Sequence, residues 1–229
     1  MEVERVSTGS EPIDSFLKGG LEKGIITNVF GESGSGKTNF CVQVAAHLAS
    51  EGEKVIYLDT EKGFSAERFS QIASEEALEN MVVNEPLDFG QQQEAINSLE
   101  SIAEEEDASA VIVDSMVSLY RLQAQGDQVQ EMNQKLSQQL SEISKVARKN
   151  DIPALVTNQV YTSFDEDDIE LVGRDVPRYW SKCLLKLSKV DSGLREIEVE
   201  KHRSMPEGKS KQFKITDNGI EETEKKGLF

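Results

Sequence analysis

The sequence predicts an α/β fold built on a mainly parallel, twisted sheet with helices on both faces. Strand-like and helix-like patterns alternate after residue 24, which is the order that crossover helices between parallel strands require. A glycine-rich loop at 31–38 joins the first core strand to the first long helix. The loop has the pattern G-x-x-x-x-G-K-[ST], which in this strand–loop–helix context is typical of proteins that bind phosphates.

The elements follow from apolar runs and their spacing. Residues 1–24 form a short lead-in rich in turns, and the first buried strand covers about 25–30. Phe40, Val44 and Leu48 recur every four residues, which predicts a helix over 37–50. We expect further core strands at 54–59, 81–83, 110–114 and 153–158, and helices near 65–73, 88–105 and 128–149. Short strands at 183–189, 195–201 and 211–215 predict an antiparallel C-terminal extension.

Length and charge limit the classes of protein to consider. The 229 residues are read as a single domain, because no linker divides them. The formal charge of −17 argues against broad nucleic-acid affinity, since phosphate contacts are normally made by cations. Two cysteines are too few for a disulfide framework. The chain starts without a signal segment and has no run of 18 apolar residues, so we expect a cytoplasmic protein without membrane contact.

The loop at 31–38 predicts a nucleoside triphosphate site. Glycines let the backbone approach the phosphates closely, and the helix that follows directs its positive dipole end to the same anion. Lys37 is expected to reach the β- and γ-phosphates, and the Thr38 hydroxyl to bind Mg²⁺. The expected nucleotide-binding residues are Gly31, Glu32, Ser33, Gly34, Ser35, Gly36, Lys37, Thr38 and the following Asn39.

Three polar side chains stand just where predicted parallel strands end. Asp114 ends an all-apolar strand, at the edge where open α/β sheets bind ligands, and is expected to hold the metal ion. Glu61 follows a second buried strand and is a candidate base for orienting an attacking water, with Asp59 as the competing carboxylate. Gln159 follows another strand and could sense the γ-phosphate through its amide.

These motifs together resemble the RecA/RadA recombinase family, and within it the short archaeal paralogues. The resemblance covers roughly residues 5–220. Besides the loop at 31–38, it rests on Thr8-Gly9-Ser10, Ile13-Asp14, Gly19-Gly20-Leu21, Tyr57-Leu58-Asp59-Thr60-Glu61, the segment 111–115 and Thr157-Asn158-Gln159-Val160. It implies a RecA-like P-loop NTPase core that uses ATP and Mg²⁺.

The resemblance also implies roles for individual residues. Glu61 would activate the water, while Lys37, Thr38 and Asp114 would hold the phosphates and Mg²⁺. Gln159 would couple the nucleotide to a DNA-binding loop, and Arg68 aligns with an arginine that stacks on adenine in related proteins, although a solvated helix arginine is the other interpretation. Lys201 and Arg203, two apart near a strand end, are a candidate finger acting in trans on a neighbour's γ-phosphate or an ordinary surface pair.

The sequence departs from a full recombinase in its DNA-binding parts. With the phosphate loop at residue 31, no room is left for an N-terminal helix-hairpin-helix domain. The first expected DNA loop, 122–132, contains no Lys or Arg, and the second, 161–178, contains six acidic against two basic residues. Such loops repel a phosphate backbone. Tyr161, Phe164, Tyr179 and Trp180 could still stack on bases, but burial or protein contact is the favoured interpretation.

The resemblance therefore predicts an accessory protein of homologous recombination and DNA repair. It implies ATP binding, slow ATP hydrolysis, weak DNA binding without strand exchange, and contact with the main RadA-type recombinase. Regulation of a Holliday-junction resolvase and assembly with further copies of the chain are further implications. The alternatives are a RecA-superfamily signalling ATPase of the circadian-clock type, acting on proteins alone, and a minimal recombinase. The segment 201–204 is compatible with the first of these alternatives.

Overall fold

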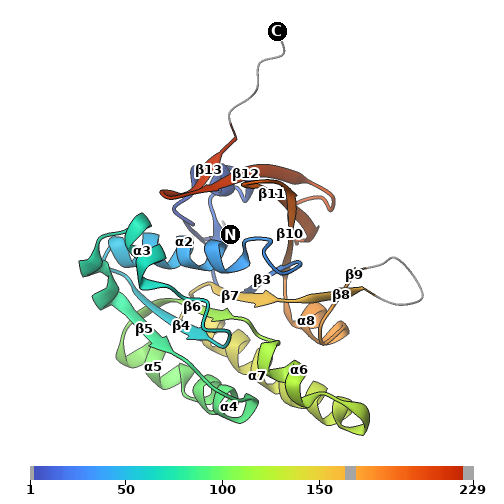
Figure 1. Cartoon of the computed structure of the whole chain (residues 1–229). Helices are drawn as coiled ribbons and strands as arrows, with labels where there is room; N and C mark the ends of the chain where they lie inside the picture. Colours follow the sequence, from blue (N-terminus) through green and yellow to red (C-terminus); the bar gives the residue numbers. More distant parts are fainter. Residues whose placement is uncertain (1–2, 163–168, 224–229) are drawn as a thin grey trace.

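The computed structural model describes residues 3–162 and 169–223. Within them, nine strands form one sheet in the order β13-β12-β11-β10-β3-β7-β6-β4-β5 (Figure 1). The strands are β3 (Ile26–Phe30), β4 (Lys54–Asp59), β5 (Met81–Asn84), β6 (Ala108–Asp114), β7 (Ala154–Asn158), β10 (Cys183–Asp191), β11 (Leu194–Lys201), β12 (Ser210–Thr216) and β13 (Gly219–Glu222).

The sheet is parallel in one part and antiparallel in the other. β3 pairs in parallel with β7 and β10, and β6 lies in parallel between β7 and β4. From β10 to β13 each strand runs antiparallel to the next. The predicted fold class is therefore confirmed, and the C-terminal extension continues the main sheet because β10 pairs directly with β3.

Helices cover both faces of the sheet, because side chains alternate along each buried strand. Ile112 and Leu155 lie in the hydrophobic cluster that contains α2 (Lys37–Ser50). Val111 and Val156 point to the other face, into the cluster formed with α4 (Phe89–Asn97), α5 (Leu99–Glu105) and α7 (Val129–Lys149). Shorter helices are α1 (Glu11–Phe16), α3 (Ala66–Ile72), α6 (Ser118–Gln123) and α8 (Asp175–Trp180), and the 3₁₀ segments are η1 (Glu75–Asn80) and η2 (Gly126–Gln128).

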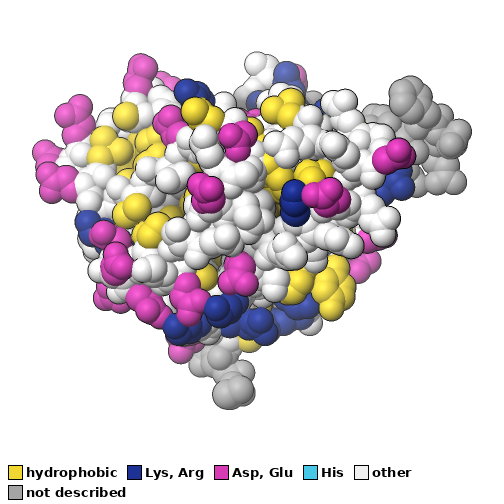
Figure 2. Space-filling view, turned by 90° about the horizontal axis from the view of Figure 1, so that it is seen from below, with side chains coloured by type: hydrophobic (Ala, Val, Ile, Leu, Met, Phe, Trp, Pro, Cys, Tyr) yellow, Lys and Arg dark blue, Asp and Glu magenta, His cyan; other side chains and the backbone are white. Residues whose placement is uncertain are grey.

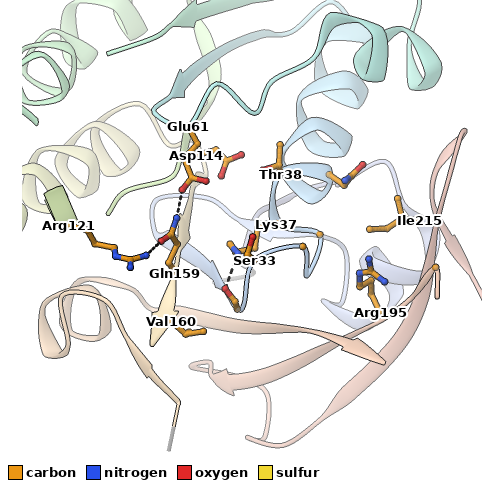
Figure 3. A pocket seen from close by; sticks show the side chains of 15 residues that line it. Ser33, Lys37, Thr38, Glu61, Asp114, Arg121, Gln159, Val160, Arg195 and Ile215 are labelled. Carbon is orange, nitrogen blue, oxygen red and sulfur yellow. Dashed lines mark hydrogen bonds between the residues drawn. The ribbon is translucent and has the colours of Figure 1, made fainter. Parts of the chain in front are cut away.

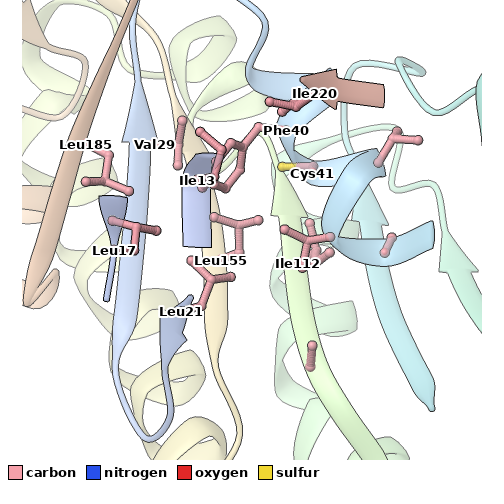
Figure 4. Close-up of a cluster of buried hydrophobic side chains, with 14 of the residues drawn as sticks. Ile13, Leu17, Leu21, Val29, Phe40, Cys41, Ile112, Leu155, Leu185 and Ile220 are labelled. Atoms are coloured by element: carbon pink, nitrogen blue, oxygen red, sulfur yellow. The ribbon is translucent and has the colours of Figure 1, made fainter. Parts of the chain in front are cut away.

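The N-terminal residues predicted as a turn-rich lead-in are part of the core. They form β1 (Arg5–Val6), α1 and β2 (Leu21–Glu22). Ile13 and Leu17 are buried, and Figure 4 shows them beside Val29 and Leu155 of the central strands. The Asp14 carboxylate holds the preceding turn by accepting hydrogen bonds from Ser7 Oγ at 2.6 Å and from Thr8 N at 2.8 Å. Six helical residues are too few to give a clear periodic signal.

Two other segments differ from the sequence prediction. The helix expected over 88–105 is divided at Ser98, whose hydroxyl donates to the Glu94 carbonyl at 3.1 Å. In the segment 161–178, the structure describes β8 (Val160–Thr162), β9 (Ile169–Leu171) and the first part of α8. Phe164 and the acidic run at 165–168 lie outside the described residues. Along the part of the chain that is described, no helix has the length and apolar character needed to cross a bilayer.

Candidate functional site

A cavity of about 650 Å³ opens at the carboxyl ends of the parallel strands (Figure 3). Gly31 directly follows β3, and Gln159 directly follows β7. Glu61 comes just after the end of β4, and Asp114 is the last residue of β6. Because these four strands are neighbours in the sheet, residues far apart in the chain meet at one edge. The full lining is Gly31, Ser33, Gly34, Gly36, Lys37, Thr38, Asn39, Glu61, Asp114, Arg121, Gln159, Val160, Gly193, Arg195 and Ile215.

The glycine-rich loop forms a closed turn before α2. The Lys37 ammonium folds back and donates to the carbonyls of Gly31 and Glu32, at 2.9 Å each. Burial lowers the pKa of Lys37, while the carboxylates of Asp114 and Glu61 oppose this shift. The loop thus holds a partly desolvated cation at the N-terminal end of a fourteen-residue helix. Both features favour an anionic ligand.

Asp114 is buried in a network of hydroxyl groups. Thr157 Oγ1 donates to its Oδ1 at 2.5 Å and the Tyr57 hydroxyl to its Oδ2 at 3.2 Å, and Thr38 also bonds to this carboxylate. Burial raises the pKa of Asp114, against the hydrogen bonds from Thr157 and Thr38. The adjacent hydroxyl and carboxylate oxygens of Thr38 and Asp114 match the donor set that Mg²⁺ uses beside phosphates. Among the described residues, no group of three or more His, Cys, Asp or Glu could hold a metal ion.

The two carboxylates that follow β4 differ in their surroundings. Asp59 is 1% exposed, and its oxygens accept hydrogen bonds from the backbone N–H groups of Glu61, Gly63 and Phe64 at 3.2, 3.1 and 2.8 Å. Asp59 therefore stabilises the turn. Glu61 is exposed and lines the cavity, so the geometry favours Glu61 of the two candidates.

The Glu61 carboxylate is already in contact with other side chains. Its Oε1 accepts hydrogen bonds from Ser115 Oγ at 2.8 Å and from Gln159 Nε2 at 2.6 Å. The oxygen of the same Gln159 amide accepts a hydrogen bond from Arg121, and Figure 3 shows the three side chains in a row. Gln159, predicted from its place after a strand, is thus brought directly to Glu61.

Two arginines in the cavity were missed by the sequence analysis. Arg121 lies one residue before the segment considered as the first DNA loop, and no motif marks it. Arg195 comes from β11, within strands interpreted as an extension. The order of the strands in the sheet brings β11 to the cavity, and no local sequence pattern predicts this position.

Arg68 lies beside the cavity rather than in its lining. Its Nε donates to Asn39 Oδ1 at 2.9 Å, and its Nη1 donates to Gln71 Oε1 at 2.7 Å and to the Asp217 carbonyl at 3.0 Å. Asn39 itself lines the cavity. The structure therefore connects Arg68 to the site through Asn39.

Lys201 and Arg203 do not line the cavity of their own chain and differ from each other. The Lys201 ammonium donates to the carbonyls of Arg178 and Ser181 at 2.7 and 2.9 Å. Arg203 Nε pairs with the buried Glu22 carboxylate at 2.6 Å, and its side chain is 49% exposed. β11 ends at Lys201, so strand alternation does not relate the direction of the Arg203 side chain to that of Lys201.

The comparisons with known proteins show the family to which this fold belongs. The family model described as Rad51 matches residues 1–223. This chain belongs to the Rad51 family. It is 38% identical to the DNA repair and recombination protein RadB of Methanococcoides burtonii, over 95% of this chain and 97% of that protein. It is 40% identical to RadB of Methanoculleus marisnigri, over 96% and 99% of the two chains.

A solved structure shares the fold of this chain. The crystal structure of the RadB recombinase superposes on this chain with a TM-score of 0.82 and 36% identity, and the match covers 95% of this chain and 99% of that one. The resemblance drawn from the motifs is therefore confirmed at the level of the family and of the fold.

Two buried polar atoms at this site of the Rad51-family fold test whether its residues fit a nucleotide. Ser35 Oγ in the loop and Arg195 Nε in the lining have no hydrogen-bond partner among the described residues. Buried polar atoms are normally paired. A ligand rich in acceptor oxygens, such as a polyphosphate, would supply such partners.

We expect Gly31→Ala to weaken triphosphate binding by about tenfold or more, because the loop backbone would have to move. A Cβ at Gly31 would lie 2.1 Å from the Leu187 carbonyl oxygen. Gly34→Ala is the matched control in the same loop. A Cβ there meets nothing within 4 Å, so this variant carries only left-handed backbone strain. Titration with a fluorescent ATP analogue measures both variants, and equal losses would contradict the packing argument.

Proposed function

We propose that this chain is an ATP-binding accessory protein of homologous recombination and DNA repair, with weak ATP hydrolysis and no strand-exchange activity. Relatives with 37–40% identity carry the name DNA repair and recombination protein RadB. The observation that carries the proposal is a contrast between two regions. The cavity brings together Lys37, Thr38, Glu61 and Asp114, as binding and hydrolysis of a triphosphate would require. In the described parts of 121–132 and 161–178, by contrast, each arginine already contacts another side chain.

The proposed nucleotide chemistry assigns one task to each residue. Lys37 and the N–H groups of residues 31–38 bind the phosphates, and Thr38 and Asp114 hold Mg²⁺. When bound, the metal ion would neutralise charge that develops on the phosphates. Glu61 orients the attacking water. One of its oxygens already accepts two hydrogen bonds, which restrains the carboxylate and supports slow turnover.

The cations near the expected DNA loops are engaged inside the chain. Arg121 bonds to Gln159, Arg174 Nε donates to the Tyr161 hydroxyl at 3.2 Å, and Arg178 pairs with Glu200. Of the aromatic candidates within the described residues, Trp180 donates to Ser137 Oγ, while Tyr179 is 72% exposed. Nucleic acid would have to displace these contacts, so we propose weak, salt-sensitive DNA binding.

The acidic surface favours the same conclusion. Figure 2 shows many Asp and Glu side chains spread over one face, with Lys and Arg gathered in a row near its edge. In helices α5 and α7, Lys145 and Lys149 pair with Glu100 at 2.5 and 2.6 Å. These contacts lower the pKa of Glu100 to about 2. Cations paired in this way are poor partners for DNA phosphates.

The proposed partners are proteins of recombination. We propose that the ATP-bound chain contacts the main recombinase of the RadA type and influences cleavage of branched DNA by a Holliday-junction resolvase. Assembly with further copies is part of this proposal. Arg203 rather than Lys201 is the candidate finger in trans, since its side chain is 49% exposed, whereas the Lys201 ammonium donates to two backbone carbonyls. In this function the chain acts as one nucleotide-binding unit.

The proposal is tested by capture of a RadA-type recombinase on this immobilised chain, with ATP, with ADP and without nucleotide. We expect ATP to increase the captured amount by about fivefold or more, since coupling energies of 1–3 kcal/mol are typical. In parallel, single-stranded DNA should be retained at low salt and released at moderate salt.

Two outcomes would contradict the proposal. Absence of both recombinase capture and DNA retention at any salt would favour the signalling ATPase. ATPase stimulated by single-stranded DNA, together with strand exchange, would favour a minimal recombinase.

A further inference from the structure

Arg121 lies in the wall between two cavities. Besides the nucleotide cavity, it lines a second one of about 330 Å³ between α6, the start of α7, β8 and the residues that follow β9. The second cavity is lined by Tyr120, Arg121, Ala124, Val129, Asn133, Tyr161, Val172, Gly173 and Arg174. A change in the position of Arg121 would therefore change the lining of both cavities.

The contacts of Arg121 form a relay from the candidate catalytic carboxylate. Gln159 donates from its amide nitrogen to Glu61 and accepts with its amide oxygen from Arg121. A guanidinium has only donors and a carboxylate only acceptors, so these two neighbours determine the orientation of the amide between them. The amide cannot turn toward another partner without breaking one of the two contacts (Figure 3).

At its other end the relay reaches α6. Arg121 belongs to this six-residue helix, and α7, which follows the short segment η2, is tied to it by a hydrogen bond of 2.7 Å from the Tyr120 hydroxyl to Asn133 Oδ1. Gln159 is the single side-chain acceptor of Arg121 within the described residues. The contact is charge-assisted and connects α6 directly to the nucleotide cavity.

We propose that Arg121 is a positioning residue that reports the state of the nucleotide cavity to α6 and to the second cavity. This inference rests on the proposed function, because it requires a triphosphate to bind beside Glu61 and Gln159. A γ-phosphate in the cavity is a strong acceptor for the Gln159 amide nitrogen. When the amide turns to it, Arg121 loses its acceptor and α6 is released from the edge of the cavity.

The test is hydrogen exchange of backbone amides, followed by mass spectrometry, with a non-hydrolysable ATP analogue, with ADP and without nucleotide. In the native chain the ATP analogue should speed exchange of residues 118–124 by about tenfold, as expected for loss of one charge-assisted hydrogen bond, and ADP should not. In Arg121→Met, exchange there should be fast without nucleotide and should no longer respond, while residues 31–38 still become protected.

Variants at Gln159 and Arg195 separate positioning from other roles. Gln159→Ala should reproduce the behaviour of Arg121→Met, and the double variant should add nothing, because both changes break the same relay. Arg195→Met removes another cationic lining side chain, whose hydrogen bonds go to the carbonyls of Asp191 and Leu194 and not to the relay, and it should keep the response of α6. Additive effects in the double variant would show that Arg121 and Gln159 act independently and would overturn the inference.

The failure of this inference is distinguishable from failure of the proposed function. If residues 31–38 of the native chain gain no protection with the ATP analogue, the nucleotide proposal itself fails. If they gain protection but α6 responds equally in the native chain and in Arg121→Met, or does not respond at all, the relay alone is refuted.

Discussion

Lys37→Met is expected to weaken ATP binding by roughly 10²- to 10³-fold, the loss of about 3–4 kcal/mol for one charge-assisted contact and its field on the phosphates. The Lys37 ammonium donates to two carbonyls of the loop at 2.9 Å. A phosphate would replace these neutral acceptors with charged ones. Isothermal titration with ATP and Mg²⁺ measures the loss.

The same variant should fold at least as well as the native chain. Burial lowers the pKa of Lys37, so the folded protein holds its charged form at a cost that methionine removes. Lys54→Met is the matched control. Lys54 is the first residue of β4, at the opposite end of this strand from the site, and its ammonium also donates to a backbone carbonyl, that of Glu79. Equal ATP affinity in the Lys37→Met variant and the native chain would remove the basis of the nucleotide site.

Glu61→Gln should slow ATP hydrolysis by about 10²-fold or more while ATP affinity changes by less than about threefold. Glutamine keeps the acceptor oxygen that Ser115 uses, but it cannot act as a base toward water. Since the native rate is expected to be low, single-turnover hydrolysis of γ-labelled ATP is the suitable measurement.

Asp59→Asn is the informative comparison for this second prediction. Its carboxylate accepts three backbone hydrogen bonds, so the substitution should lower the free energy of unfolding by about 1–3 kcal/mol. Hydrolysis by the molecules that remain folded should persist. A folded but inactive Asp59→Asn variant, together with an active Glu61→Gln variant, would reverse the two roles.

The sequence predicted the parts of the site that are local in the chain. The loop at 31–38 lies between a strand and a helix that are contiguous with it, so its position relative to α2 follows from the motif. Glu61, Asp114 and Gln159 could be assigned to one edge because parallel strands end at the same side of a sheet. The sequence could not choose firmly between Asp59 and Glu61, which are two residues apart. That choice depends on which carboxylate already accepts hydrogen bonds from the backbone of the turn.

Contacts between distant segments could not be predicted. The lead-in became part of the core because α1 packs on strands that come later in the chain. Arg203 proved to pair with Glu22, 181 residues earlier, and Lys201 to be held by carbonyls near α8. These pairings depend on the position of β10 and β11 beside β3 in the sheet. The periodicity of side chains within a strand does not predict which strands become neighbours.

The sequence by itself determined that this chain is an α/β protein with a phosphate-binding loop, since both follow from contiguous patterns. Only the tertiary structure decided that Arg121 and Arg195 belong to the site and that Arg121 touches Gln159. The physical reason is the order of the sheet, β12-β11-β10-β3-β7-β6-β4, which brings residues from Gly31 to Ile215 to one cavity. Local propensities give the strands, and the packing of strands against one another gives the site.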